Sequence, residues 1–198
     1  MKSIGKGAEA ELYKSNFLGK GIVVKERICK KYRIMEIDVP LRRTRTKNEA
    51  RLLSAAKKAM VPVPTIYEIG TYNIFMSRID GKLLRDLRTT PFLLRKAGEY
   101  LARLHKSNIV HGDYTTANLM VDSDGKLYVI DFGLGSLSKD LEDKAVDILL
   151  MKKSLDNRVW YREFLKGYAR GNREYRAVLK QLEEVERRGR YVVRAMQG

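Results

Sequence analysis

The chain has 198 residues, 44% of them hydrophobic, and Lys and Arg exceed Asp and Glu by 40 to 24, a net charge of +16. This length and apolar content predict one compact unit with a real core. A single cysteine, Cys29, excludes an internal disulfide. Because the sequence has no apolar run of about 18 residues and no signal-peptide pattern, we expect a cytoplasmic protein without membrane contact.

The first predicted element is a loop near the N-terminus, which follows Ile4 and is rich in small residues. Small residues let backbone amides approach a phosphate group closely. Two glycines one residue apart are also typical of a plain β-turn, and alanine replaces the third glycine of the usual kinase pattern. We call residues 5–10 the phosphate loop and expect nucleotide contacts from Gly5, Lys6, Gly7, Ala8, Glu9 and Ala10.

A β-branched strand follows, in which the run Ile22-Val23-Val24 ends at Lys25. Many lysines of this chain lie on its surface, and Lys25 differs from them by its place directly after the apolar run. We predict that Lys25 contacts the α- and β-phosphates of a nucleotide.

A basic connection leads to a predicted helix at about 45–60, where apolar residues recur with helical spacing. Glu49 is the only acidic residue in that range. It can simply balance the surrounding cations, or it can hold Lys25 against the phosphates as a kinase helix glutamate does. We favour the pairing with Lys25.

Two strands are predicted next, at about 65–70 and 72–78, after Pro62 and Pro64. The stretch 76–80 then reads as a hinge between two lobes, where we expect Met76 and Ile79 to contact adenine. Accordingly, we expect residues 1–80 to form a β-rich N-lobe with one main helix, and residues 81–198 to form a small helical C-lobe.

The strongest pattern lies in residues 111–133. Asp113 precedes Asn118 by five residues, and Asp131-Phe132-Gly133 follows after two short predicted strands at 119–121 and 127–130. Protein kinases use this order and spacing. A helix at 92–106 is expected to pack beneath this catalytic loop (residues 111–118), and further helices are expected near 140–153, 158–170 and 173–188.

These residue types fit phosphoryl transfer, which depends on positioning and charge neutralisation. Asp113 would orient or deprotonate the attacking hydroxyl or water. Asn118 and Asp131 offer the oxygen ligands that Mg²⁺ prefers. Each carboxylate alone would read as a turn or cap residue, but the joint spacing favours catalysis. The sequence therefore predicts an α+β, reduced two-lobed protein-kinase-like fold that uses ATP and Mg²⁺.

The sequence departs from signalling kinases near the predicted catalytic aspartate. Gly112 stands where those kinases commonly carry an arginine that pairs with a phosphorylated activation loop, so this switch is expected to be absent. Only residues 134–146 separate Gly133 from Asp147, and no Ala-Pro-Glu sequence occurs. So short a segment offers little platform for a peptide substrate.

Nearly the whole chain resembles the small kinase-like subunit of the KEOPS complex. The matching segments are the phosphate loop, the basic stretch with the glutamate helix, the catalytic loop with Asp131 to Gly135, the stretch 142–147, and the ending with Arg187 to Arg190, Met196 and Gly198. The stretch 191–194 is less basic than the family's tail. The resemblance implies an atypical serine/threonine kinase or ATPase, acting beside a threonylcarbamoyl-transferase subunit and other KEOPS subunits to make N6-threonylcarbamoyladenosine in tRNA.

Other functions remain as alternatives. A small-molecule kinase of the aminoglycoside phosphotransferase type also carries His-Gly-Asp, but the intact Asp131-Phe132-Gly133 and the short C-lobe disfavour it. A right-open-reading-frame kinase of ribosome assembly would usually carry extra N-terminal helices before the phosphate loop. A catalytically dead, basic scaffold would have lost the lysine or a metal ligand, and this chain keeps all of them: Lys25, Glu49, Asp113, Asn118 and Asp131.

The positive charge is concentrated in two stretches. Residues 25–58 contain 12 basic and four acidic residues, and residues 152–198 contain 13 and six. A nucleotide does not need this excess, whereas a polyanion such as tRNA explains it through phosphate neutralisation. The alternative is an ordinary solvated basic surface. His105 and His111 have no other potential metal ligands at a suitable spacing in the sequence. We interpret His111 as a structural support for the catalytic loop.

Overall fold

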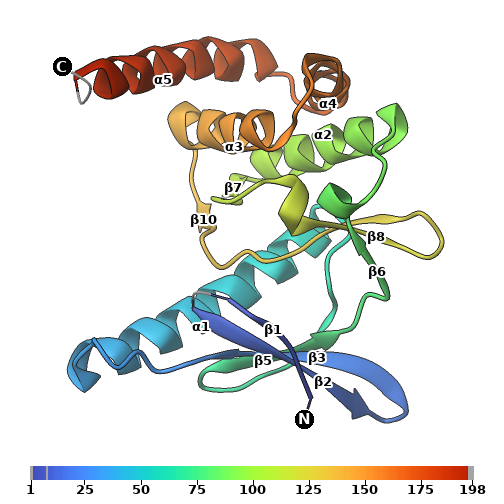
Figure 1. Ribbon diagram of the computed structural model, residues 1–198, viewed down its shortest axis with the longest axis vertical. Coiled ribbons are helices and arrows are strands. Elements are labelled where there is room, and N and C mark those ends of the chain that lie inside the picture. Colours follow the sequence, from blue (N-terminus) through green and yellow to red (C-terminus); the bar gives the residue numbers. More distant parts are fainter. Residues whose placement is uncertain (1, 8, 196–198) are drawn as a thin grey trace.

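The computed structural model describes residues 2–7 and 9–195 (Figure 1). The N-terminal region is an antiparallel five-stranded sheet in the order β1-β2-β3-β5-β4, with α1 (Met35–Lys58) lying across it. In β3, Ile22 and Val24 are buried on one face of the pleat, as alternating β-branched residues predict. The strands are β1 (Lys2–Lys6), β2 (Ala10–Phe17), β3 (Lys20–Arg27), β4 (Ile66–Ile69) and β5 (Asn73–Ser77).

Helix α1 begins about ten residues earlier than its sequence pattern predicts, so the expected connection at 35–44 is wrong. Its first turns are exposed and contain Pro40, which has no backbone N–H to donate within the helix. One polar contact within the helix and one to β3 hold them in place. Buried Asp38 accepts a hydrogen bond from Arg42 Nε at 2.6 Å, and Arg42 Nη1 donates to the Arg27 carbonyl at 3.2 Å. Glu49 is therefore not the only acidic residue of this helix, because Glu36 and Asp38 belong to it as well.

The C-terminal region is a layer of helices around one core (Figure 1). Thr90 accepts a hydrogen bond from Leu93 N and Pro91 is the first helical residue, a usual helix start. The buried side chains of the core include Leu101, Phe164 and Tyr168. The predicted helices are confirmed, with α5 running beyond its predicted end: α2 (Pro91–Lys106), α3 (Leu141–Ser154), α4 (Arg158–Gly171) and α5 (Tyr175–Ala195).

Short strands connect the two regions and frame the catalytic loop. The predicted hairpin is confirmed, and β6 (Gly81–Leu83) pairs with its first strand, so residues from 81 onward pack with the C-terminal region. We propose the boundary between the lobes at residues 80 and 81 on this pairing. The remaining elements are η1 (Leu84–Asp86), β7 (Ile109–Val110), η2 (Thr116–Asn118), β8 (Leu119–Asp122), β9 (Leu127–Val129) and β10 (Ser136–Leu137).

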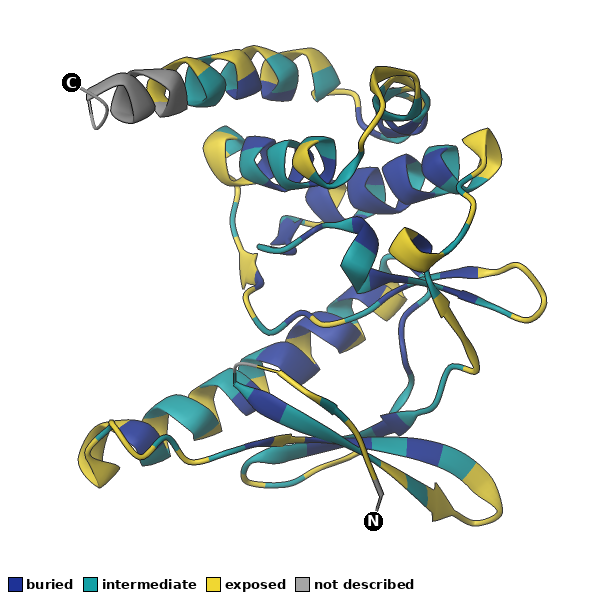
Figure 2. Ribbon diagram, viewed as in Figure 1, coloured by how far each residue is buried: buried dark blue, intermediate teal, exposed yellow. Residues whose placement is uncertain are grey.

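Buried residues line α2 and α3 and, on the other side of the short strands, the C-terminal half of α1 (Figure 2). Leu52 and Leu53 of α1 belong to the same core cluster as Leu104 of α2 and Phe132. The glutamate helix and the Asp-Phe-Gly segment are thus packed as one unit. Among the described helices, none combines the length and the apolar composition that a bilayer crossing requires.

Candidate active site

Lys25, Glu49 and Asp131 meet between the two regions, although they are far apart in the chain. Lys25 Nζ lies 2.6 Å from Glu49 Oε1 and 2.7 Å from Asp131 Oδ1. Glu49 is 1% exposed, and Lys25 is also buried. Burial acts to lower the pKa of Lys25, but the two carboxylates outweigh it and raise this pKa above its usual 10.5. The ammonium therefore stays charged.

Arg27 is a site residue that our sequence interpretation did not include. Its Nη2 lies 2.6 Å from Glu49 Oε2, so Glu49 binds one cation with each carboxylate oxygen. Arg27 is two residues after Lys25 on β3, and alternate residues of a strand face the same side. That spacing was a usable signal. The buried Glu49 is thereby paired with two cations, which offsets the desolvation of its charge.

Asp131 has a left-handed backbone, with φ of 60°, which is uncommon for a residue other than glycine. Its Oδ1 accepts hydrogen bonds from Gly133 N at 3.0 Å and from Lys25 Nζ. Burial acts to raise the pKa of Asp131, but the charge and hydrogen bond of Lys25 hold it below the usual 3.8. The carboxylate is ionised, as a metal ligand must be.

Asp113 and Asn118 lie together at the two ends of a tight turn in the catalytic loop. Asn118 Nδ2 donates to the Asp113 carbonyl at 2.8 Å and to Asp113 Oδ2 at 2.7 Å. The turn is fixed on α3, because Thr116 N donates to Ser154 Oγ at 3.2 Å. The five-residue spacing read from the sequence therefore corresponds to direct contact between the two side chains.

A buried aspartate, Asp147 of α3, anchors the start of the catalytic loop and was also missed. Its oxygens accept hydrogen bonds from the backbone N–H groups of His111 and Gly112, both at 2.8 Å, and one of them lies 3.1 Å from His105 Nε2. His105 Nδ1 lies 2.8 Å from the Tyr168 hydroxyl. Because Tyr168 can donate to Nδ1, a neutral His105 donates through Nε2 to Asp147.

His111 supports the catalytic loop from within, in agreement with the sequence interpretation. Its Nδ1 accepts from Asp113 N at 3.3 Å, and its Nε2 lies 3.0 Å from the Ile130 carbonyl. One neutral tautomer, protonated on Nε2, satisfies both contacts. The ring also packs on Phe132, with centroids 4.6 Å apart. His111 thus links the catalytic loop to the Asp-Phe-Gly segment.

The residue before Asp113 is glycine for a steric reason. Gly112 has a φ of 78°, and a Cβ on it would lie 2.3 Å from the Leu134 carbonyl oxygen. The short segment after Gly133 is held against this site: Asn48 Nδ2 donates to the Gly135 carbonyl at 3.1 Å, and β10 pairs with β7. An arginine at position 112 is therefore excluded by the path of this segment.

The phosphate loop is the turn between β1 and β2. Gly7 N donates to the Ala10 carbonyl at 2.9 Å, and Lys6 Nζ lies 3.1 Å from Glu11 Oε1. A register shift between Ser3 and Gly5 interrupts the β1–β2 ladder at the start of the loop. Ala8 lies outside the described residues. Nucleotide contact by Gly5, Lys6, Gly7, Ala8, Glu9 and Ala10 stays a prediction.

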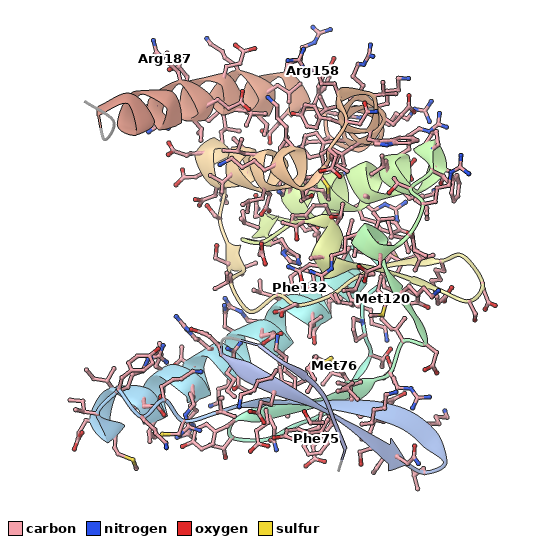
Figure 3. The ribbon with its side chains drawn as sticks, viewed as in Figure 1. Phe75, Met76, Met120, Phe132, Arg158 and Arg187 are labelled. Carbon is pink, nitrogen blue, oxygen red and sulfur yellow. The ribbon has the colours of Figure 1, made fainter. Side chains whose placement is uncertain are left out.

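The predicted hinge follows β5. The side chains of Met76 and Met120 project from β5 and β8 into the space between the two regions (Figure 3). Met120, on the strand after the catalytic loop, is an apolar candidate for the floor of an adenine site that sequence reasoning did not name. The main chain of Ile79 makes no backbone–backbone hydrogen bond with residues 2–7 and 9–195, so its N–H and C=O are candidates for adenine contact. Contact of Met76 and Ile79 with a nucleotide stays a prediction.

A cavity of about 450 Å³ lies on another side of the hinge, where residues 77–80 face the end of α1 and the β8–β9 turn. Ile79 contributes to its wall, whereas Lys25, Asp113 and Asp131 do not. This cavity is therefore separate from the charged site formed by Lys25, Glu49 and Asp131.

The oxygen atoms of Asp131 and Asn118 suit a magnesium ion. Asn118 uses its Nδ2 for Asp113, and no described residue hydrogen-bonds its Oδ1 or the Oδ2 of Asp131. In the part of the chain that the structure describes, no cluster of three or more His, Cys, Asp and Glu side chains could hold a metal alone. Magnesium is commonly bound by one or two protein ligands, with phosphate oxygens of the substrate and waters completing its coordination shell.

Comparison with known proteins identifies the family of this chain. The family model of the RIO domain matches residues 24–151. The chain is 39% identical to the KEOPS complex subunit Bud32 of Pyrococcus abyssi, and the match covers 96% of each chain. The chain belongs to the Bud32 family of RIO-domain proteins. The resemblance seen in the sequence is thereby confirmed.

A longer relative comes from Methanobrevibacter smithii. The chain is 44% identical to its "Probable bifunctional tRNA threonylcarbamoyladenosine biosynthesis protein" over 95% of this chain. The chain spans 36% of that relative, little more than a third of its length.

A solved structure with the same fold is that of the "Rio2 kinase-ADP/Mg2+-phosphoaspartate complex" from Chaetomium thermophilum. It aligns with a TM-score of 0.65 at 18% identity, and the alignment covers 96% of this chain and 70% of that one. At this identity the match shows the fold. The predicted α+β kinase-like fold is confirmed.

Proposed function

We propose that this chain is a magnesium-dependent ATP-using enzyme of the atypical serine/threonine kinase or ATPase type. One observation carries the proposal: Lys25, Glu49 and Asp131 form a contiguous ion triad. Such a triad is what protein kinases use to hold nucleotide phosphates and metal. The triad keeps a charged ammonium at the place where the phosphates of a nucleotide would bind.

Each residue of the site has a definite task in this proposal. Lys25, oriented by Glu49, binds the phosphates. Asp131 and Asn118 would hold magnesium, which would neutralise phosphate charge. Asp113, whose Oδ2 is oriented by Asn118, accepts the proton of the attacking hydroxyl or water. The main chain of the hinge and the side chains of Met76 and Met120 would bind adenine.

The short segment after Gly133 favours water or one specialised hydroxyl as the acceptor. Asn48 holds the Gly135 carbonyl, and Ser138 N donates to the Asn108 carbonyl at 2.9 Å, so both halves of the segment are tied to the body of the protein. A peptide substrate needs an exposed platform beside the catalytic aspartate. This segment offers few free backbone groups for one.

We further propose that the chain acts with a threonylcarbamoyl-transferase subunit and other KEOPS subunits in N6-threonylcarbamoyladenosine synthesis on tRNA. The support is membership of the Bud32 family, whose Pyrococcus abyssi member is named a KEOPS complex subunit, and the role in tRNA threonylcarbamoyladenosine biosynthesis named for the Methanobrevibacter smithii relative. The net charge of +16 supports contact with a polyanion. If the chain binds tRNA, affinity should fall steeply between low and physiological salt, and a flat dependence would contradict the polyanion argument.

The deciding experiment follows γ-labelled ATP with Mg²⁺ and separates free phosphate from phosphoprotein. Wild type and Asp113→Ala are compared alone, with bulk tRNA, and with the transferase partner. Asp124→Ala, an exposed carboxylate in the β8–β9 turn, is the matched control. We expect turnover to fall by roughly 10²- to 10⁴-fold in Asp113→Ala and to be unchanged in the control.

The distribution of label then assigns the reaction. Asp113-dependent label on protein identifies a kinase, and Asp113-dependent free phosphate that rises with the partner or tRNA identifies an ATPase. Turnover that is absent from every wild-type mixture would reject the enzyme and leave a basic scaffold.

A further inference from the structure

A carboxylate in the phosphate loop is held by three arginines. Glu9 Oε2 lies 3.4 Å from Arg27 Nη1, Glu9 Oε1 lies 3.7 Å from Arg33 Nη2, and Arg45 Nη1 hydrogen-bonds Glu9 Oε1. The three cations come from β3, from the connection after it, and from α1. We call Arg27, Arg33 and Arg45 the arginine clamp. Burial acts to raise the pKa of Glu9, but the clamp, chiefly Arg45, holds it below its usual 4.5.

The clamp is connected to the catalytic ion triad through one residue. Arg27 binds Glu9 with one guanidinium nitrogen and Glu49 with the other, at 3.4 and 2.6 Å. Glu49 in turn binds Lys25, which binds Asp131. Charges of opposite sign therefore alternate without interruption from the phosphate loop to the proposed metal ligand.

A glutamate is an unexpected residue in a loop that covers phosphates, because its charge repels them. Within the described residues, the hydrogen bonds and ion pairs of its side chain are all with the clamp. Glycine-rich loops are mobile, and ordering such a loop on binding weakens affinity by its conformational entropy. A tether that orders the loop beforehand removes part of this penalty.

We propose that Glu9 is a positioning residue that latches the phosphate loop onto the arginine clamp. This inference rests on the proposed use of ATP. The latch fixes the loop relative to β3 and α1, and Arg27 ties that position to the glutamate that orients Lys25. Glu9 does not touch the reacting atoms in this role. It acts by preorganising the backbone amides that face the nucleotide.

The latch and simple electrostatics predict opposite effects of Glu9→Gln. Removing a negative charge near a polyanion strengthens nucleotide binding by Coulomb attraction alone. Losing the latch weakens it, because a neutral amide does not hold three arginines. We expect the dissociation constant of a fluorescent ADP analogue with Mg²⁺ to rise roughly three- to tenfold, with KM for ATP rising more than kcat falls.

Two matched variants control this measurement. Glu26→Gln makes the same change on β3, where the side chain is exposed and makes no ion pair with a described residue. It should bind the analogue within about twofold of wild type. Arg45→Met should weaken binding like Glu9→Gln, and the double variant should weaken it no further, because both changes break one contact.

Hydrogen exchange of the backbone amides in residues 5–10 tests the latch without any nucleotide. Faster exchange in Glu9→Gln, with unchanged exchange in Glu26→Gln, supports it. Equal exchange, or binding as tight as wild type or tighter, overturns it. If wild type does not bind the analogue, the proposed function fails, and the exchange measurement alone decides whether Glu9 anchors the loop.

Discussion

The catalytic loop and the phosphate loop belong to different regions of the molecule and are held by different forces. Asp147, which is fully buried, anchors the catalytic loop through backbone hydrogen bonds. Glu9, which anchors the phosphate loop, has a side chain that is 34% exposed, and its partners are ion pairs. Buried hydrogen bonds are little affected by salt, whereas exposed ion pairs are screened.

This difference suits the two proposed tasks. A general base must stay within hydrogen-bond distance of the group from which it takes the proton, so the structure that holds the base should be rigid. A loop that covers a nucleotide must also open to release the product, so its support should be weak enough to break. Changes in the first support should therefore reduce global stability, and changes in the second should affect the loop alone.

The largest effect is expected from Asp147→Ala. It leaves the N–H groups of His111 and Gly112 and the ring of His105 without their buried acceptor. The free energy of unfolding should fall by roughly 3–5 kcal/mol, as measured by denaturant titration. Asp143→Ala, an exposed carboxylate one turn earlier on α3, is the control and should change it by less than about 1 kcal/mol. Similar small losses in both variants would mean that Asp147 is not the anchor.

Gly112→Ala should have the next largest effect. Gly112 and Gly125 have nearly equal φ values, 78° and 79°, but only at Gly112 would a Cβ meet another atom within 4 Å. Gly125→Ala therefore measures backbone strain alone, about 1 kcal/mol. Gly112→Ala should destabilise by roughly 2–4 kcal/mol, because the Leu134 carbonyl must also move. Equal losses in the two unfolding curves would contradict the steric account of this position.

A smaller effect should come from the titration of His105. Burial lowers the pKa of His105 below its usual 6.5, despite the opposing influence of Asp147. Below pH 6.5 the unfolded chain binds a proton at His105 that the folded chain does not. The contribution of neutral His105 to the free energy of unfolding is therefore fully present above pH 6.5. It is lost as pH decreases through the folded pKa, by up to about 1.4 kcal/mol per pH unit.

His105→Gln isolates this contribution in unfolding curves at pH 7.5, 6.5 and 5.5. The variant keeps a neutral hydrogen-bonding side chain and retains His111, so its stability should change less with pH than that of wild type. An unchanged slope would assign the pH dependence to other groups.

The smallest effect on stability should come from salt. Raising ionic strength from about 0.1 to 1 M shortens the screening length from about 10 to 3 Å, which should weaken the arginine clamp. Amides of residues 5–10 should exchange faster, those of 111–118 should not, and the free energy of unfolding should change by less than about 1 kcal/mol. Equal responses of the two loops would remove the distinction between them.

Sequence reasoning succeeded where the chemistry is encoded by short-range spacing. Asp113 and Asn118 are five residues apart, and one tight turn brings them into contact. Lys25 was set apart by the β-branched run before it, and that run forms the central strand β3. Glu49 was set apart by its basic surroundings and binds Lys25. The roles of these residues in turnover stay predictions until the labelled-ATP experiment is done.

Short-range sequence patterns do not predict where α1 begins. Met35 and Ile37 in its first turn are exposed, so the segment lacks the apolar face from which a helix is predicted. Pro40 also argues against a helix there. What stabilises these turns is the contact of Asp38 with Arg42, and of Arg42 with the Arg27 carbonyl and the Tyr72 ring. The two contacts of Arg42 outside the helix depend on where β3 and the segment before β5 lie, and the periodicity of the sequence does not record this.

The sequence by itself determined the kinase-like order of elements, the family resemblance and the residues of the expected site, because motif spacing is a local property of the chain. The tertiary structure decided how that site is supported. It brought Asp147 under Gly112, and it joined Glu9 to Glu49 through Arg27. These partners are separated by 18 to 35 positions, and only the folded packing of strand, helix and loop sets the distances between charges on which their free energies depend.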